Sequence, residues 1–369
     1  MGGWRRMDDS VQQLIRSRAE RAIAEKVFPG CVIGLIRAPR PSVASGEGGN
    51  KHIVIPVGTI DGKVPTQKNT IYDLASITKS IPLASLALLL TTLDPPRLNL
   101  GGKVVEYLQE LQNDYDATIE DLLRYRVTGP RLSQLHLKTF EEIRTYVFEH
   151  GFDAPAGDGA YTNLPAFLLG IILERVGGAT LPALAHRYFF EPLQMNDTTF
   201  FPRNPDTYNS TYRHNNVYAN IAPTEIVEGK EIRGIVHDES ARVFARARRA
   251  VGHAGLFSTA PDLLNFLGTL LLPAEQSHIL KNVGMIVDGA QEGLGWEIDR
   301  EWMGAFAKAS ATRGATVFGK TGFTGTSILC ETEKGIGLVI LSNRTHPHRP
   351  PDNSAINAFR KDVADIVFG

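Results

Sequence analysis

The stretch Asp73-Leu74-Ala75-Ser76-Ile77-Thr78-Lys79 places a serine three positions before a lysine, at the head of a long uncharged segment. In a helix, positions i and i+3 lie on one face, so the Lys79 ammonium can reach the Ser76 hydroxyl. A serine hydroxyl is a weak nucleophile at neutral pH, and a lysine can activate it when burial or nearby positive charge lowers the lysine pKa. Residues 81–93 carry no charged side chain and predict a buried helix. Taken alone, the spacing also fits a serine near a helix start followed by a surface lysine.

Two further short motifs change that interpretation. Tyr161-Thr162-Asn163 stands just before an apolar segment that predicts a helix, and Lys320-Thr321-Gly322 opens a segment that predicts a strand. The order S-x-x-K, Y-x-N, K-T-G resembles the serine β-lactamase and penicillin-binding protein superfamily. The tyrosine in the middle motif is similar to that of class C β-lactamases, the DD-peptidases related to them, and the carboxylesterases built on the same fold.

Longer segments support the resemblance. Residues 69–76, 252–260 and 320–327, together with Leu341-Ser342-Asn343-Arg344, look like the subgroup called β-lactamase-related serine hydrolases. The resemblance covers roughly residues 28–345. Where such proteins commonly carry a His-x-Ser-Gly turn, this chain has Tyr125-Arg126-Val127-Thr128-Gly129. This departure alters one expected wall of the pocket, and with it the choice of substrate.

The resemblance implies a role for each motif residue. Ser76 would attack a carbonyl carbon to form an acyl-enzyme, and Lys79 and Tyr161 would share the proton transfers, with the base of each half-reaction left open. A tyrosine titrates near pH 10 when unperturbed, but two nearby ammonium groups would favour its phenolate. The resemblance also implies substrate-binding residues. Asn163 would hold Lys79 and a substrate amide, and Lys320, Thr321 and Gly322 would lie on an edge strand along which the substrate binds. The N–H of Phe323 would form an oxyanion hole with that of Ser76.

Two other hydrolase arrangements are less well supported. His237, Asp238 and His253 invite a Ser-His-Asp triad, but no G-x-S-x-G elbow accompanies them, and they are better explained as structural hydrogen-bonding groups. No histidine pair has H-E-x-x-H spacing, so a zinc hydrolase is unsupported. We therefore expect neither a metal nor a cofactor.

Composition excludes several classes of function. A net charge of −1 gives no field that would attract nucleic acid, so we expect no nucleic-acid partner. The resemblance implies a small-molecule ester or amide substrate. Cys31 and Cys330 each lie in an expected strand and are predicted to be buried thiols. The uncharged run before Asp94 is too short to span a bilayer, so no membrane association is expected. Residues 1–18 do not read as a secretory signal, which favours a cytoplasmic protein, with an exported protein lacking its leader as the alternative. The oligomeric state stays open.

The pattern of strands and helices predicts an α+β fold. Residues 31–36 and 52–60 predict one hairpin, and residues 326–331 and 337–342 predict another. Strands near both ends with helices between them predict one antiparallel sheet formed by both chain ends, as the resemblance to a β-lactamase/transpeptidase-like fold also implies. We expect residues 1–80 and 290–369 to form the sheet-containing subdomain and residues 81–289 a mostly helical one, with the active site between them.

These observations predict a serine hydrolase that cleaves an ester or amide through an acyl-enzyme. Lys320 and Thr321 suit a substrate carboxylate, which favours a β-lactamase or D-Ala-D-Ala peptidase. The altered turn at residues 125–129 and the lack of an export signal favour small esters. We place a carboxylesterase slightly ahead. Acyl transfer is a third possibility. A penicillin-binding sensor or scaffold without turnover is the rival of another class, which the presence of every motif residue argues against.

Overall fold

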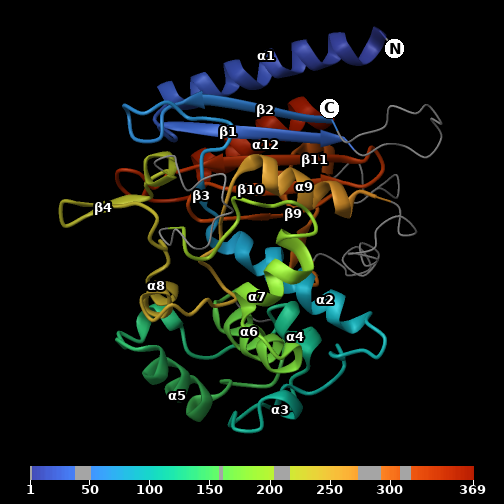
Figure 1. The fold of residues 1–369 in the computed structure, drawn as a ribbon, viewed down its shortest axis with the longest axis vertical. Helices are drawn as coiled ribbons and strands as arrows, with labels where there is room; N and C mark the ends of the chain where they lie inside the picture. The colour runs from blue at the N-terminus through green and yellow to red at the C-terminus, as the bar shows by residue number, and fades with distance from the viewer. Residues whose placement is uncertain (1, 38–50, 158–160, 203–216, 273–291, 308–316) are drawn as a thin grey trace.

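The computed structural model describes residues 2–37, 51–157, 161–202, 217–272, 292–307 and 317–369. Its main sheet has seven strands in the order β2-β1-β11-β10-β9-β8-β7, with antiparallel neighbours throughout (Figure 1). The strands are β1 Gly30–Arg37, β2 Lys51–Gly58, β7 Glu292–Gly293, β8 Trp296–Ile298, β9 Val317–Thr321, β10 Ser327–Glu331 and β11 Ile336–Ser342. Both expected hairpins are confirmed by the β1–β2 and β10–β11 pairings. The sheet therefore joins the two ends of the chain, as predicted for the α+β fold.

Helices cover both faces of this sheet. Helices α1 Gly2–Ala24 and α12 Ser354–Phe368 pack together on one face, where Ile33 and Ile340 belong to their core. Helix α9 Ala260–Leu270 covers the other face, against β1 and β11. A Cβ at Gly34 would lie 3.0 Å from the Leu264 side chain, so this glycine permits the close approach of α9. Although α9 falls within residues 81–289, it packs on the sheet, and it also contacts the helical region, where the Phe266 ring centroid lies 5.5 Å from that of Phe189.

The helical region lies below the sheet in Figure 1. Its α-helices are α2 Ser85–Thr91, α3 Val104–Tyr107, α4 Ile119–Leu123, α5 Phe140–His150, α6 Leu164–Gly177, α7 Leu181–Ala185 and α8 Glu239–Arg246. Shorter helical turns are η1 Ala75–Lys79, η2 Ser80–Ala84, η3 Leu132–Gln134, η4 His186–Phe190, η7 Val217–Asn220 and η8 Glu301–Met303. Two small antiparallel pairs complete the structure: β3 Tyr72–Asp73 with β6 Phe257–Ser258, and β4 Glu225–Val227 with β5 Lys230–Ile232.

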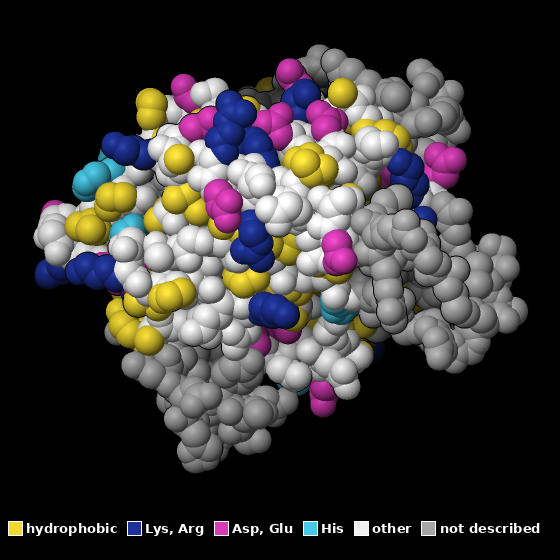
Figure 2. All heavy atoms as spheres, turned by 90° about the horizontal axis from the view of Figure 1, so that it is seen from above, with side chains coloured by type: hydrophobic (Ala, Val, Ile, Leu, Met, Phe, Trp, Pro, Cys, Tyr) yellow, Lys and Arg dark blue, Asp and Glu magenta, His cyan; other side chains and the backbone are white. Residues whose placement is uncertain are grey.

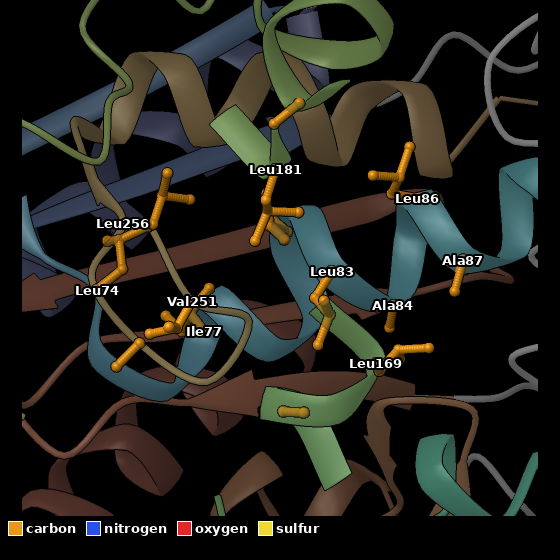
Figure 3. Packing of buried hydrophobic residues seen from close by; sticks show 14 of the residues in the cluster. Leu74, Ile77, Leu83, Ala84, Leu86, Ala87, Leu169, Leu181, Val251 and Leu256 are labelled. Carbon is orange, nitrogen blue, oxygen red and sulfur yellow. The ribbon is translucent and has the colours of Figure 1, made fainter. Parts of the chain in front are cut away.

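The segment that follows Lys79 is buried, as the uncharged sequence predicts, but it is not one regular helix. A 3-10 turn (η1) leads into a π turn (η2) and then into α2, and Ile81 has non-helical backbone angles at the junction. Figure 3 shows apolar side chains of η1 and η2, among them Ile77 and Leu83, packing with Leu169 of α6 and with Val251 and Leu256. This packing fixes the start of the segment between the sheet and the helical region.

Surface and cysteine properties follow the composition. Figure 2 shows basic and acidic side chains interspersed over one face of the molecule, with no large area of a single sign. Cys31 and Cys330 are buried free thiols, as predicted, and burial raises the pKa of both. Among the described residues no single helix is long and apolar enough to cross a bilayer, although the bent pair Leu164–Gly177 and Leu181–Phe190 passes that test of length and composition together.

Candidate active site

The serine of the S-x-x-K motif lies on a tightly held turn. Strand β3 pairs with β6, and the buried Asp73 carboxylate at its end accepts hydrogen bonds from the backbone N–H of Ala75 (2.8 Å) and of His237 (2.8 Å). Ala75, directly before Ser76, has a φ of 47°, a left-handed conformation that an alanine adopts only when its surroundings impose it. Burial raises the pKa of Asp73 to about 6. The turn thus presents a half-buried Ser76 on a strained backbone.

Lys79 reaches the serine as the spacing predicts, although on a 3-10 turn instead of an α-helix. Three residues per turn align i and i+3, and the Lys79 Nζ lies 3.0 Å from the Ser76 Oγ. The same Nζ donates a 2.8 Å hydrogen bond to the carbonyl oxygen of His253. Burial lowers the pKa of Lys79, and the Lys320 ammonium adds to this effect, whereas Tyr161 and Asp238 oppose it. A buried lysine with a lowered pKa is suited to take a proton from Ser76.

Tyr161 stands between the two lysines of the site. The Nζ of Lys320 is 4.6 Å from the centroid of the Tyr161 ring, and that of Lys79 is 5.3 Å away. Desolvation opposes ionisation of the phenol, but Lys320, Lys79 and a hydrogen bond with Ser76 outweigh it and lower the pKa of Tyr161. The side chain is 52% exposed, so solvent screens part of this effect. Tyr161 therefore has the position and charge environment of a second proton-transfer group.

Lys320 lies at the end of β9 and is paired with a carboxylate. Strand β9 is interior to the sheet, not an edge strand as expected from the sequence, because β8 pairs with it. That pairing involves only Phe318 and Gly319, so Lys320 and Thr321 lie beyond it and pair with β10 alone. The buried Lys320 Nζ lies 3.1 Å from Glu297 Oε1. Burial opposes the charge of Lys320, but Tyr161 and Glu297 raise its pKa.

The turn after β9 packs directly on the turn that carries Ser76. A Cβ at Gly322 would lie 2.4 Å from the Leu74 carbonyl oxygen, so only glycine fits. The hydroxyls of Thr324 and Thr326 donate to the carbonyls of Asp73 (2.7 Å) and Leu74 (3.1 Å). These contacts bring the backbone around Phe323 beside the turn of Ser76.

The environment of Phe323 fits the expected oxyanion hole and adds an aromatic rim. Among the described residues, the N–H groups of Ser76 and Phe323 donate to no protein acceptor, which leaves both for a substrate oxygen. The Phe323 side chain is 44% exposed and stacks on His237, with ring centroids 5.7 Å apart. The rim of the site is therefore partly apolar.

The altered turn at residues 125–129 supplies another aromatic wall. Tyr125 has a φ of 56° and contacts Tyr161, with ring centroids 4.9 Å apart and ring planes tilted by 43°. The Lys320 Nζ lies 5.4 Å from the centroid of the Tyr125 ring. Tyr125 thus contacts both members of the Lys320–Tyr161 pair.

Asn163 has a different partner from the one expected. It precedes α6 at the N-cap position without a side-chain capping bond, and its Nδ2 donates to Asp238 Oδ2 at 3.1 Å instead of holding Lys79. His253 holds the lysine in its place, through its backbone carbonyl. Asn163 is displaced from the predicted role because Asp238, distant in sequence, provides a charged acceptor.

The rival triad does not assemble around Ser76. The His253 Nε2 is 3.0 Å from the Ser240 Oγ and 3.4 Å from Asp238 Oδ1. His237 Nε2 instead lies 3.0 Å from Glu225. These side chains are hydrogen-bonded structural groups, as the sequence favoured.

Sequence reasoning missed Glu297 and gave Asp238 no part in the site. Glu297 is held by a 2.8 Å hydrogen bond from Trp302 Nε1 as well as by Lys320. Neither carboxylate belongs to a recognisable motif, and each meets its partners only through the fold. Among the described residues no cluster of His, Cys, Asp and Glu is arranged to hold a metal ion.

Comparison with known proteins agrees with this geometry. The model of the family described as Beta-lactamase matches residues 11–361. A putative D-alanyl-D-alanine carboxypeptidase of Escherichia coli K12 is 26% identical over 324 residues, which cover 78% of this chain and 71% of that protein. A corresponding protein of Salmonella typhimurium is 25% identical over 326 residues, 78% of this chain and 72% of that one.

Solved structures show the same fold. The D-amino acid amidase of Ochrobactrum anthropi SV3, complexed with L-phenylalanine amide, superposes with a TM-score of 0.70 at 18% identity, covering 97% of this chain and 98% of that one. EstCE1, described as a hydrolase with promiscuous acyltransferase activity, gives 0.69 at 20% identity, covering 98% and 99%. With Ser76, Lys79 and Tyr161 gathered at one site and the family match spanning most of its length, the chain belongs to the beta-lactamase family of serine hydrolases.

Proposed function

We propose that the protein is a carboxylesterase of the β-lactamase fold that acts on small uncharged esters. The Ser76 Oγ attacks the ester carbonyl while its proton passes to the Lys79–Tyr161 pair, and the N–H groups of Ser76 and Phe323 hold the developing oxyanion. Collapse of the tetrahedral intermediate breaks the ester C–O bond, and the departing alkoxide takes up that proton. Water then attacks the acyl-enzyme, gives a proton back through the same pair, and releases the carboxylic acid and free Ser76.

The ion pair between Lys320 and Glu297 is the observation on which the proposed preference for uncharged substrates rests. A β-lactam or a D-Ala-D-Ala peptide presents a carboxylate, for which a free ammonium would be the natural partner. Here the Lys320 ammonium is buried and already neutralised by a carboxylate 3.1 Å away. An incoming anion would have to compete with Glu297 and would be repelled by it, whereas a neutral ester meets neither cost.

The aromatic surroundings support the same conclusion. Tyr125 and Phe323 present rings around the reacting groups. Such rings favour apolar acyl or alcohol groups over charged ones. The amidase and EstCE1 structures share only the fold, so the specificity of this chain rests on these residues of its own site.

The substitution Glu297→Gln tests the proposal. Wild-type enzyme should have a higher kcat/KM for p-nitrophenyl butyrate than for the anionic β-lactam nitrocefin. Removing the carboxylate frees the Lys320 charge, so the ratio of nitrocefin to ester activity should rise roughly 10- to 100-fold, the factor that a charge-assisted hydrogen bond implies. Glu301→Gln removes an exposed carboxylate nearby in the sequence and should leave the ratio unchanged.

Two results would redirect the assignment. Faster turnover of nitrocefin or of a D-Ala-D-Ala peptide than of any neutral ester by wild-type enzyme would favour a β-lactamase or peptidase, in line with the carboxypeptidase relatives. Formation of a stable penicillin adduct without product would favour a sensor.

A further inference from the structure

A largely buried carboxylate lies behind the catalytic lysine and has no part in the reaction just described. Asp238 occupies the N-cap of α8, where its Oδ1 accepts hydrogen bonds from the Ala241 N–H at 2.9 Å and from the Ser240 hydroxyl at 2.6 Å. A cap alone needs only one of these bonds. The remaining contacts of Asp238 extend away from α8.

Those contacts connect Asp238 to the segment that carries Tyr161 and to the loop that binds Lys79. Its Oδ2 accepts from the Asn163 side chain at 3.1 Å, and Asn163 lies on the same short segment as Tyr161, at the start of α6. Its Oδ1 lies 3.4 Å from the Nε2 of the fully buried His253, and Ser240 bridges the two with a 3.0 Å contact to the same nitrogen. The backbone carbonyl of that histidine accepts the 2.8 Å hydrogen bond of Lys79.

We propose that Asp238 is a positioning residue for catalysis: its carboxylate ties the Tyr161–Asn163 segment to the His253 loop and thereby holds Lys79 and Tyr161 at their working distances from Ser76. The inference rests on the acyl-enzyme chemistry of Ser76 proposed above, but not on the identity of the substrate. It gives Asn163 a role as the link to Tyr161, and it gives His253 a role through its main chain.

The charge of Asp238 adds an electrostatic effect to this geometry. Burial opposes its ionisation, but His253, the Ala241 N–H and Ser240 outweigh burial and hold the pKa of Asp238 well below its usual range. These contacts favour the anionic form of Asp238, whose charge raises the pKa of Lys79 against the effects of burial and of Lys320. Removing this charge should lower the Lys79 pKa further.

Other charged groups face this cluster and must be considered in any pH profile. Burial raises the pKa of Asp73 to about 6, and the charge of Asp238 contributes to this rise whereas that of Arg242 opposes it. Lys79 also faces Lys320 and Tyr161. A change in the Asp73 pKa would also affect a pH profile, so the Asp238 variant is compared in wild-type and Asp73→Asn backgrounds.

The experiment measures the rate of covalent labelling of Ser76 by a fluorophosphonate as a function of pH, in wild type and in Asp238→Asn. This probe reports acylation whatever the natural substrate is. The asparagine is nearly isosteric and keeps a cap acceptor, so we expect a folded protein with a labelling rate at pH 7 reduced roughly 10- to 100-fold. The acid limb of the profile should move to lower pH in both Asp73 backgrounds, because a charge that favours protonated Lys79 has gone.

The matched control is Glu239→Gln. Glu239 is the next residue, is exposed, and pairs with Arg349 instead of with Asn163 or His253. Its removal changes net charge equally and should leave both rate and profile unchanged. An Asp238→Asn enzyme that labels as fast as Glu239→Gln, or that is slower with an unmoved acid limb, would overturn the proposal.

Two further outcomes are informative. If Asp238→Asn does not fold, Asp238→Glu keeps the charge but lengthens the side chain by one methylene. It should retain the wild-type acid limb with a labelling rate lowered several-fold, and an unchanged rate would overturn the proposal. A wild-type protein that is not labelled at Ser76 would overturn the proposed function and this inference together, whereas fast labelling of Asp238→Asn would overturn this inference alone.

Discussion

The Nζ of Lys79 and the backbone carbonyl of His253, 174 positions apart in the sequence, are joined by a 2.8 Å hydrogen bond. This bond leaves the Nζ directed at the Ser76 hydroxyl, 3.0 Å away. The main chain of one segment therefore orients the lysine that the side-chain motif of another segment supplies. We therefore expect activity to depend on the position of the 252–256 loop as well as on the motif.

Replacing Ser76 with alanine should abolish covalent labelling and essentially all hydrolysis, because the nucleophile is lost. Ser76 is half-buried, and its hydroxyl contacts Lys79 and Tyr161 of the site, so the fold should persist. Intact-mass measurement after exposure to a fluorophosphonate checks the labelling, and circular dichroism checks the fold. Labelling that continues at another serine would contradict the assignment.

Substitutions of Lys79 and of Tyr161 should lower the activity of the enzyme non-additively. Both contact the same hydroxyl, and Lys79 affects the pKa of Tyr161. Lys79→Ala and Tyr161→Phe should each lower kcat/KM by roughly 100-fold or more, the scale of general acid-base catalysis. Because groups that act as a unit are lost together, the double variant should be little worse than the poorer single one. A loss equal to the product of the two would show independent roles.

Gly252→Ala should disturb the loop that holds Lys79. A Cβ at this position would lie 2.3 Å from the Ala166 carbonyl oxygen of α6 and 2.7 Å from Leu83. The backbone on one side cannot yield, so the loop must shift, at a cost of about 1–3 kcal/mol in the free energy of unfolding. Urea denaturation measures this cost, and fluorophosphonate labelling should slow in parallel.

The control for this change is Gly101→Ala. A Cβ there would meet only Asn99, at 3.8 Å. The free energy of unfolding should stay within a few tenths of a kcal/mol of the wild-type value, and the labelling rate within about a factor of two. If Gly252→Ala behaves like this control, the loop is not the rigid support that the contacts indicate.

Asp262 should make the free energy of unfolding fall as pH rises. Burial raises its pKa to about 7, against hydrogen bonds from the Thr198 hydroxyl and the Asp197 N–H. Between the unfolded pKa, about 4, and about 7, the folded protein holds a proton on Asp262 that the unfolded chain has lost. This group therefore stabilises the fold fully below pH 4 and loses its contribution by pH 7, with a slope of up to ~1.4 kcal/mol per pH unit.

Asp262→Asn should flatten this part of the stability profile. Urea unfolding at several values between pH 4.5 and 8 measures the difference between variant and wild type, and Glu20→Gln, an exposed carboxylate on α1, serves as control. An identical pH slope in wild type and Asp262→Asn would show that Asp262 is ionised throughout.

The sequence alone determined the nucleophile motif and the outline of the fold. Ser76 and Lys79 meet because a spacing of three residues aligns them on any tight helical turn, so even the unexpected 3-10 geometry preserves their contact. The hairpins of residues 30–58 and 327–342 follow from local strand patterns and turn residues, which act over short distances. The order of the three motifs was sufficient to predict the fold that the family match and the solved structures share.

Which charges surround those residues depends on the packing of distant segments. Glu297 neutralises Lys320, Asp238 takes Asn163 away from Lys79, and the His253 carbonyl replaces it, and each of these contacts joins segments far apart in the chain. No periodicity or motif specifies such pairs, because a buried charge takes whichever partner the packing of distant segments brings within hydrogen-bond distance. The sequence thus supplied the motif residues, whereas the fold set their pKa values and placed Glu297 beside Lys320.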